Sequence, residues 1–399
     1  MSIELGNPLE GNRKFENREF SLENMRGYSE MCTQVAWRIA EKIHDSEGKD
    51  IALLLPSRGA IPIFVGAMLA FANEPSLKEF KLGNVFELPL LSCFDYVRKE
   101  IGEIPTEGKV RVLIFPFTAD IDLTGLGFDS RIKRMSDEVL ASMRRFGARA
   151  ITEFFKPLGE RTRSELKTFL SFLETVEGRR GINNFISNFP QVDKMLAIDT
   201  VISGQASWTI LDELEKEGRY ISSGRIDPIL VVDEDGKKLK KSFRSFVDQR
   251  PDDSIRVSRI LTEDRGAALE GVAALVYPGL IVKFGEEHKG IYPLFGSWHD
   301  IPLVYKEKYL GVLNSFFDTI NSIIRGASQN EVLEKRDIFC DRLIQSRVLK
   351  GGEDLIGKEF KIKPSIARVR ETSSHVMQLY FSDEVVRQIM SAIIKRQTQ

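Results

Sequence analysis

Cysteine and histidine are scarce in this sequence of 399 residues. The three cysteines are Cys32, Cys93 and Cys340, which lie far apart and form no CxxC pair. The four histidines are His44, His288, His299 and His375, and their positions lack the spacing of metal ligands. These absences exclude a disulfide framework and a cysteine-rich zinc site, and they fit a reducing cytosol.

Excess charge of one sign and long apolar runs are also missing. The formal net charge is −1, which argues against bulk electrostatic attraction to nucleic acid or to a membrane surface. No segment reaches the roughly 18 uncharged apolar residues of a membrane span. The N-terminus lacks the apolar stretch of a signal peptide. We therefore expect a cytoplasmic protein with no membrane partner.

The composition is that of a globular protein with a sizeable core, since 42% of the residues are hydrophobic and 29% are charged. We predict three segments along the chain. Residues 1–49 form an N-terminal arm, loose up to residue 20, followed by an amphipathic helix over 21–44. Residues 50–300 form the core, with a helical insertion at about 118–192. Residues 301–399 form a mainly helical C-terminal region.

Strands alternate with helices in the core segment. Residues 51–55, IALLL, form an apolar run short enough for a strand buried on both faces. The bend PSRGA follows, and then a buried helix over residues 61–72. Residues 195–198 start a second unit of strand, loop and helix. This alternation predicts an α/β fold with a mostly parallel sheet flanked by helices.

Other segments support the same fold class. We predict strands over residues 85–94 and 110–117, joined by the exposed, mobile connection DYVRKEIGEIPTEGK. PILVVDEDGKKLKKSF reads as a strand entering a hairpin through its Asp-Gly turn. GVAALVYPGLIVKF is the last strong strand candidate, and KEFKIKPSIARVR is a further extended candidate near the C-terminus. Gly218 fits a position just past the helix that follows residue 204.

Two loops at the ends of predicted strands have the residue types of a phosphate site. In parallel sheets, ligands bind beyond the carboxyl ends of the strands. A phosphate needs several backbone N–H groups pointing inward, preferably at a helix N-terminus. Ser203, Gly204, Ala206 and Ser207 are small enough for that approach. Asp199, at the strand end, has a carboxylate that accepts hydrogen bonds from sugar hydroxyls.

Together these loops resemble those of the type I phosphoribosyltransferases. That family transfers the 5-phosphoribosyl group of PRPP to an acceptor, usually a nitrogenous base, and releases pyrophosphate. Its PRPP signature is matched by an apolar strand at residues 195–198, Asp199, two apolar residues and the loop 203–207. Its pyrophosphate loop is matched by residues 57–60, SRGA, and its mobile catalytic hairpin by YVRKEIGEIPTEGK.

The resemblance implies a role for each part. Asp199 would bind the ribose hydroxyls, and Lys99 or Arg98 would close over the leaving pyrophosphate. Substrate binding falls to Ser57, Arg58, Gly59, Ala60, Thr200, Ser203, Gly204, Gln205, Ala206 and Ser207. Mg²⁺ is the implied cofactor, held mainly by PRPP oxygens and water rather than by protein side chains. Family members are often dimers, so a homodimer is a candidate assembly.

Two residues depart from the family pattern. Thr200 replaces the second acid of the signature, and Gln205 stands where the family usually has its glycine, which here is Gly204. These departures support an alternative, in which a phosphoribosyltransferase-like module binds PRPP, a nucleotide or a protein partner without turnover. The large helical additions fit such a regulatory role. A second alternative is an unrelated α/β enzyme that uses the loop for another phosphorylated ligand.

Simpler interpretations stay open for the individual features. Residues 199–207 also fit an ordinary strand end and a Ser-capped helix. Arg58 also fits a surface turn, and Arg98 and Lys99 fit a solvated connection. KKLKKSFR is either a basic segment that contacts nucleic acid phosphates or a solvent-exposed, charged face of a hairpin. The near-neutral net charge of the chain favours the solvent-exposed face. YPLFGSWHD forms either a hood in which Phe295 or Trp298 stacks on an acceptor base, or a packed aromatic turn.

Overall fold

The computed structural model describes residues 19–78, 85–89, 94–101, 110–115, 119–122, 141, 144–145, 147–161, 188–234, 239–262, 269, 272–273, 277, 279–284, 291–296 and 303–346. The principal elements of the α/β core are α2 (Leu22–His44), β1 (Ile51–Leu55), α3 (Ala60–Asn73), β2 (Phe86–Glu87), α5 (Asp95–Ile101), β3 (Val110–Ile114), β5 (Lys194–Val201), α10 (Gln205–Gly218), β6 (Ile226–Asp233), α11 (Lys241–Asp248) and β7 (Ser254–Val257). The other elements are α4 (Pro75–Lys78), β4 (Ala119–Asp122), η3 (Glu153–Phe155), α7 (Leu158–Arg161), η4 (Pro251–Asp253), β8 (Gly279–Phe284), β9 (Ile291–Gly296), α13 (Leu303–Ile324) and α14 (Gln329–Ser346).

Six strands form one sheet in the order β2-β3-β1-β5-β6-β7, and every neighbouring pair is parallel. This confirms the predicted α/β class with a mostly parallel sheet. Strand β1 is buried along its whole length, as its continuous apolar sequence predicts. After β1 the chain first forms β2 and β3, which lie on one side of β1 in the sheet. It then forms β5, β6 and β7, which lie on the other side. The strand order therefore reverses between β1 and β5, and we call this place the switch point.

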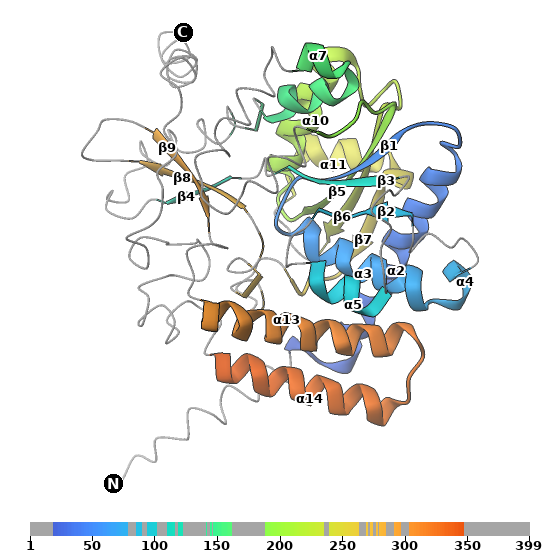
Figure 1. Cartoon of the computed structure of the whole chain (residues 1–399), viewed down its shortest axis with the longest axis vertical. Coiled ribbons are helices and arrows are strands. Elements are labelled where there is room, and N and C mark those ends of the chain that lie inside the picture. The colour runs from blue at the N-terminus through green and yellow to red at the C-terminus, as the bar shows by residue number, and fades with distance from the viewer. Residues whose placement is uncertain are drawn as a thin grey trace.

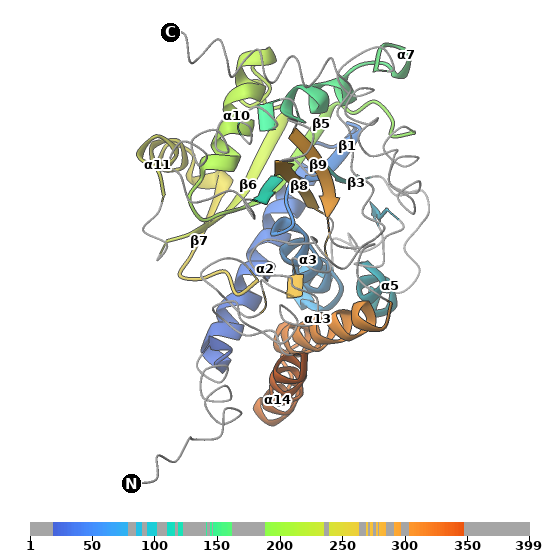
Figure 2. The same cartoon turned by 90° about the vertical axis from the view of Figure 1, so that its left-hand side faces the viewer.

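Helices cover both faces of the sheet (Figure 1). Helices α2 and α3 lie on one face, and α10 lies on the other, as the second view also shows (Figure 2). Every residue of α3 from Ala60 to Phe71 is buried, because α3 lies between the sheet and the packed helices α2 and α13. Helix α14 packs along α13. The C-terminal helices α13 and α14 confirm the helical pattern predicted from about residue 305.

Several sequence predictions agree closely with these bounds. The helix predicted over residues 21–44 is α2, which starts at Leu22 because Ser21 caps it. The Ser21 Oγ accepts the Asn24 N–H at 3.2 Å. The buried helix predicted over residues 61–72 is α3, and the strand predicted at 195–198 is the central part of β5.

The two predicted hairpins are wrong over the described residues. The strand β6 is followed by a helix, α11, in which Phe243 and Val247 form a buried i, i+4 pair. The expected mobile connection after residue 94 begins as the helix α5, with Tyr96 and Val97 buried. Apolar side chains at helical spacing outweigh the turn signals in both segments. Residues 102–109 and 235–238 lie outside the described residues.

Smaller differences have local causes. Among the described residues of the segment predicted as strand over 85–94, Phe86–Glu87 form the strand, and the strand predicted over 110–117 ends at Ile114. Phe20, assigned to a loose arm, is fully buried. Gly218 belongs to α10, and the left-handed residue after the helix is Arg219, with a φ of 54°. A Cβ on Gly218 would lie 2.6 Å from the Tyr220 ring, so this glycine makes room for a side chain.

A second sheet, of three strands, has the order β4-β8-β9. Strand β4 lies in the segment predicted as a helical insertion, so that segment is not helical throughout. The last strong strand candidate contains β8, and YPLFGSWHD contributes its first five residues to β9 rather than to a turn. Residues 297–300 and the extended segment predicted near the C-terminus lie outside the described residues. No helix in the described part of the chain is both long and apolar enough to cross a membrane.

Candidate functional site at the switch point

The sequence-predicted loops meet at the carboxyl ends of β1 and β5. We call residues 56–59 and 202–204 the switch loops. The first switch loop is joined to β5 by a buried hydrogen bond in which the Ser57 Oγ donates to Asp199 Oδ1 at 2.7 Å. The Ser57 Oγ also accepts the Ala60 N–H at 3.1 Å and so caps the start of α3. The structure thus brings together residues that are 142 positions apart in the chain, at the place where ligands bind in open α/β sheets.

Asp199 is held by three donors from the protein. Besides Ser57, the Thr200 N–H donates to Oδ1 at 3.0 Å, and the Ser207 Oγ donates to Oδ2 at 2.7 Å. The side chain is only 4% exposed. Burial raises the pKa of Asp199, while the hydrogen bonds from Ser57 and Ser207 oppose that rise.

This arrangement makes Asp199 of β5 a clamp between the first switch loop and α10. Asp199 is buried, so a ribose hydroxyl could reach its carboxylate only after the surrounding groups rearrange. Among the described residues there is no group of three His, Cys, Asp or Glu side chains that could hold a metal.

The loop after β5 has the shape expected at a helix N-terminus. Gly204 has a φ of 72° and directly precedes α10, and its carbonyl accepts the Trp208 N–H at 2.8 Å. The Ser203 Oγ accepts the Gln205 N–H at 3.4 Å. The first turn of α10 carries no acidic residue. The electropositive end of this helix is therefore not neutralised by a carboxylate of its own first turn.

The remaining predicted residues divide between the site and its surroundings. Arg58 is half-buried on the first switch loop, and Gly59 and Ala60 are buried. Gly59 has a φ of −68°, so its backbone conformation does not require glycine. Thr200 and Ala206 are half-buried beside the second loop.

Arg98 and Lys99 do not lie on a mobile hairpin. They belong to α5, where the Arg98 guanidinium donates to Asp95 at 2.9 Å and to the Pro89 carbonyl. Lys99 is exposed on the same helix. The closing motion expected of these residues would need α5 to unfold or move as a unit.

Sequence reasoning missed the contribution of α11. The Lys240 N–H donates to the Ser203 carbonyl at 3.2 Å, and Lys240 Nζ donates to the Gln205 side-chain oxygen. The Phe243 ring lies directly against Gly204. The signal was present in the apolar spacing of Leu239, Phe243 and Val247, which is helical, but the Asp-Gly pair before it suggested a hairpin.

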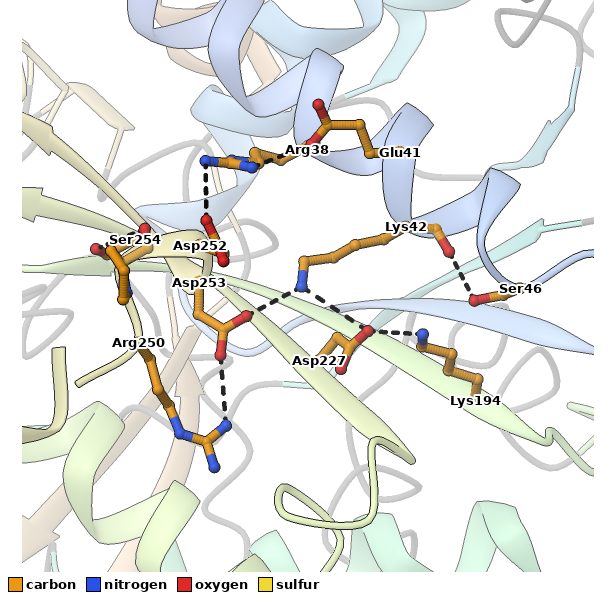
Figure 3. Close-up of polar contacts among 11 residues, drawn as sticks. Arg38, Glu41, Lys42, Ser46, Lys194, Asp227, Arg250, Asp252, Asp253 and Ser254 are labelled. Carbon is orange, nitrogen blue, oxygen red and sulfur yellow. Dashed lines mark hydrogen bonds and ion pairs between the residues drawn. The ribbon is translucent and has the colours of Figure 1, made fainter.

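Two other polar regions lie away from the switch loops. At the amino ends of β5 and β6, Lys42 Nζ bridges Asp253 at 3.0 Å and Asp227 at 3.8 Å, and Lys194 Nζ binds the same Asp227 oxygen at 2.6 Å (Figure 3). Arg250 adds a contact to Asp253 at 3.4 Å. Positive and negative groups alternate here, so the network fastens α2 to the sheet and leaves little net charge to attract a ligand.

The second region is a cavity of about 510 Å³ between α2 and residues 256–261. Two of its arginines already have acidic partners in the protein. Arg256 pairs with Asp248 and Glu234, and Arg259 pairs with Glu19 at 2.6 Å. These pairs reduce the attraction of the cavity for an anion.

No family model, curated protein or solved structure matches this chain. The resemblance to type I phosphoribosyltransferases therefore rests on the two switch loops and their order in the chain. The fold itself is established independently as α/β, with a six-stranded all-parallel sheet and C-terminal helices.

Proposed function

We propose that the switch point binds a phosphorylated ribose ligand, PRPP or a nucleotide, as a regulatory binding module. The observation that carries the proposal is the Ser57–Asp199–Ser207 clamp, which holds both switch loops at one place. The phosphate would lie on the N–H groups at the start of α10, near Ser203, and a second phosphate group would lie near Arg58.

Two features favour binding over turnover. Asp199 is only 4% exposed and is held by Ser57, Thr200 and Ser207, so it would contact a ribose only after a rearrangement. Arg98, the expected closing residue, is held by Asp95 and the Pro89 carbonyl. A protein that only binds the ligand needs neither group to act on the leaving pyrophosphate.

Transfer of the phosphoribosyl group is the second candidate. It is favoured by the exposed Lys99 on the helix that follows β2, because this lysine remains available to a leaving group if α5 moves. The acceptor in that case would be a nitrogenous base. Pyrophosphate release across a panel of bases, lost in Lys99→Ala, would support transfer. Binding without release supports the module.

Titration calorimetry with PRPP, with and without Mg²⁺, tests the binding proposal, and Ser203→Asp is the informative variant. An aspartate at position 203 keeps an oxygen that can accept the Gln205 N–H, so the fold is retained. Its charge would repel the phosphate and weaken binding by about tenfold or more, which corresponds to at least about 1.4 kcal/mol. Ser223→Asp, in the exposed turn beyond the other end of α10, is the matched control.

Two results would contradict the proposal. One is the absence of binding at millimolar PRPP and at millimolar ribose 5-phosphate, for the wild-type protein and for every variant. The other is equal affinity in the Ser203→Asp and Ser223→Asp variants, which would place the phosphate away from the second switch loop.

A further inference from the structure

Helix α11 covers the second switch loop. Three contacts hold it there: the Lys240 N–H on the Ser203 carbonyl, Lys240 Nζ on the Gln205 side chain, and the Phe243 ring on Gly204. Phe243 is fully buried in this position. The loop that carries the proposed phosphate site therefore has a neighbouring helix of the same chain packed on it.

Gly204 shows how close this packing is. A Cβ at Gly204 would lie 2.3 Å from the Phe243 Cδ1 atom and 2.6 Å from its Cγ. A glycine in a phosphate loop leaves space for the ligand to approach the backbone. Here that space is filled by the Phe243 ring. The Phe243 side chain thus occupies the space in which a side chain at position 204 would lie.

We propose that α11 is an autoinhibitory cover of the switch point, with Phe243 seated where a phosphorylated ligand would approach Gly204. The inference rests on the proposed function, because it names how access to that same site is controlled. Ligand binding would require the N-terminal end of α11 to lift, taking Phe243 away from Gly204.

The contacts of α11 are arranged for such a movement. Its C-terminal half is held by the ion pair of Asp248 with Arg256 at 2.5 Å and by Phe246 beneath the Arg250 guanidinium, 5.1 Å from the ring centroid. At its N-terminal end, the polar contacts described above come from Lys240 alone. Phe243 stacks on Phe246 and packs edge-on against Trp208. Lifting the first turn would mainly cost the burial of the Phe243 ring.

A phosphate would offset part of that cost. In the closed arrangement Lys240 Nζ donates to a neutral amide oxygen, that of Gln205. An anionic oxygen is a stronger acceptor for an ammonium group than a neutral amide is. The ligand and Phe243 therefore compete for one place, and ligand binding should in turn loosen α11, since coupling between two equilibria is reciprocal.

The test compares Phe243→Leu with Phe246→Leu. Both variants replace one ring of the same stacked pair, but only Phe243 lies against Gly204. Hydrogen exchange without ligand, followed by mass spectrometry, reports the cover directly. Phe243→Leu should speed exchange of the amides in residues 203–207, and Phe246→Leu should not. Lys240→Ala, an exposed substitution that leaves the buried face of α11 intact, should also speed it.

Calorimetry with PRPP and with ribose 5-phosphate measures how much the α11 cover weakens ligand binding. If the closed form holds about nine-tenths of the molecules, Phe243→Leu should tighten binding on the order of tenfold. Phe246→Leu should leave the affinity near that of the wild type. Binding seen only in the Phe243→Leu variant would support both the site and its cover.

Other outcomes separate the two proposals. Equal affinities for wild type, Phe243→Leu and Phe246→Leu would overturn the autoinhibitory role while leaving the ligand site in place. Unchanged exchange over residues 203–207 in both Phe243→Leu and Lys240→Ala would also overturn it. Failure of every variant to bind either ligand would overturn the proposed function itself, and with it the inhibitory role.

Discussion

Asp199 illustrates how one buried carboxylate holds separate parts of a fold together. Removing a carboxylate from water is costly unless donors replace the lost solvent. Ser57, Thr200 and Ser207 supply those donors from the first switch loop, β5 and α10. The same bonds that make the burial tolerable also hold these three parts of the fold together.

We expect Asp199→Ala to destabilise the protein strongly. It would leave two buried hydroxyls and the Thr200 N–H without their acceptor, at a cost of about 2–4 kcal/mol in the free energy of unfolding. Urea denaturation measures the change. Asp212→Ala, on α10, removes an exposed ion pair with Lys216 and should cost less than about 1 kcal/mol. Similar losses in both variants would contradict the role of Asp199 as a clamp.

Some of this site was predictable from single residues, and some was not. Ser57 and Asp199 were expected near each other because both follow buried parallel strands. The sequence did not show that Ser57 donates to Asp199, since strand register and loop path fix that bond. Gly204 was recognised as a loop glycine, but its tight neighbour, Phe243, comes from a helix 39 positions further on, as the numbering shows.

At the scale of elements, α2 and α3 approach each other very closely at one point of their interface. A Cβ on Gly66 of α3 would lie 2.2 Å from the Cys32 Sγ atom of α2. Cys32 is fully buried, and burial raises the pKa of its thiol. Glycine here serves the close approach of two helices, and the thiol acts as a small apolar group.

This contact gives a prediction for Gly66→Ala. The new methyl group would collide with the Cys32 Sγ, so we expect a loss of about 1–3 kcal/mol in the free energy of unfolding. Gly27→Ala, on α2 with open space around it, should stabilise the protein by up to about 1 kcal/mol through helix propensity. Thermal and urea unfolding measure both. Adding Cys32→Ala to Gly66→Ala should recover stability, and no recovery would place the strain elsewhere.

The elements that sequence reasoning missed share one cause. In α5 and α11, turn residues near one end suggested a hairpin. Burial of apolar side chains against other parts of the fold stabilises a helix instead. The Tyr96 hydroxyl of α5 donates to Asp318 of α13 at 2.7 Å, and that partner lies more than 200 residues away in the chain. Long apolar segments such as β1 and α3 were predicted well because their own apolar residues indicate that they are buried.

At the scale of the whole molecule, the aromatic cluster around Phe316 joins α2 to the helices α13 and α14. Phe316 of α13 packs against Phe20, Tyr28 and Phe339, with ring centroids 6.5, 5.2 and 5.4 Å apart. Phe20 precedes α2, and Phe339 lies on α14. The N-terminal helix and the C-terminal helices therefore share one apolar core.

We expect Phe316→Ala to weaken the entire fold rather than the C-terminal helices alone. The loss should be about 3–5 kcal/mol, and unfolding should remain a single transition by both circular dichroism and tryptophan fluorescence. Ile338→Ala, at a side chain that is 45% exposed on α14, should change stability by less than about 0.5 kcal/mol. A separate early transition in Phe316→Ala would show that α13 and α14 fold independently.

The pairing of β1 with β5 has a consequence for how the chain reaches this structure. The two central strands are neighbours in the sheet, but a long stretch containing β2, β3 and β4 separates them in sequence. Closing so large a loop costs entropy before the central contact can stabilise anything. We therefore expect the two central strands to pair late in folding. During synthesis, β1 must wait for β5 to leave the ribosome before it gains its second neighbour.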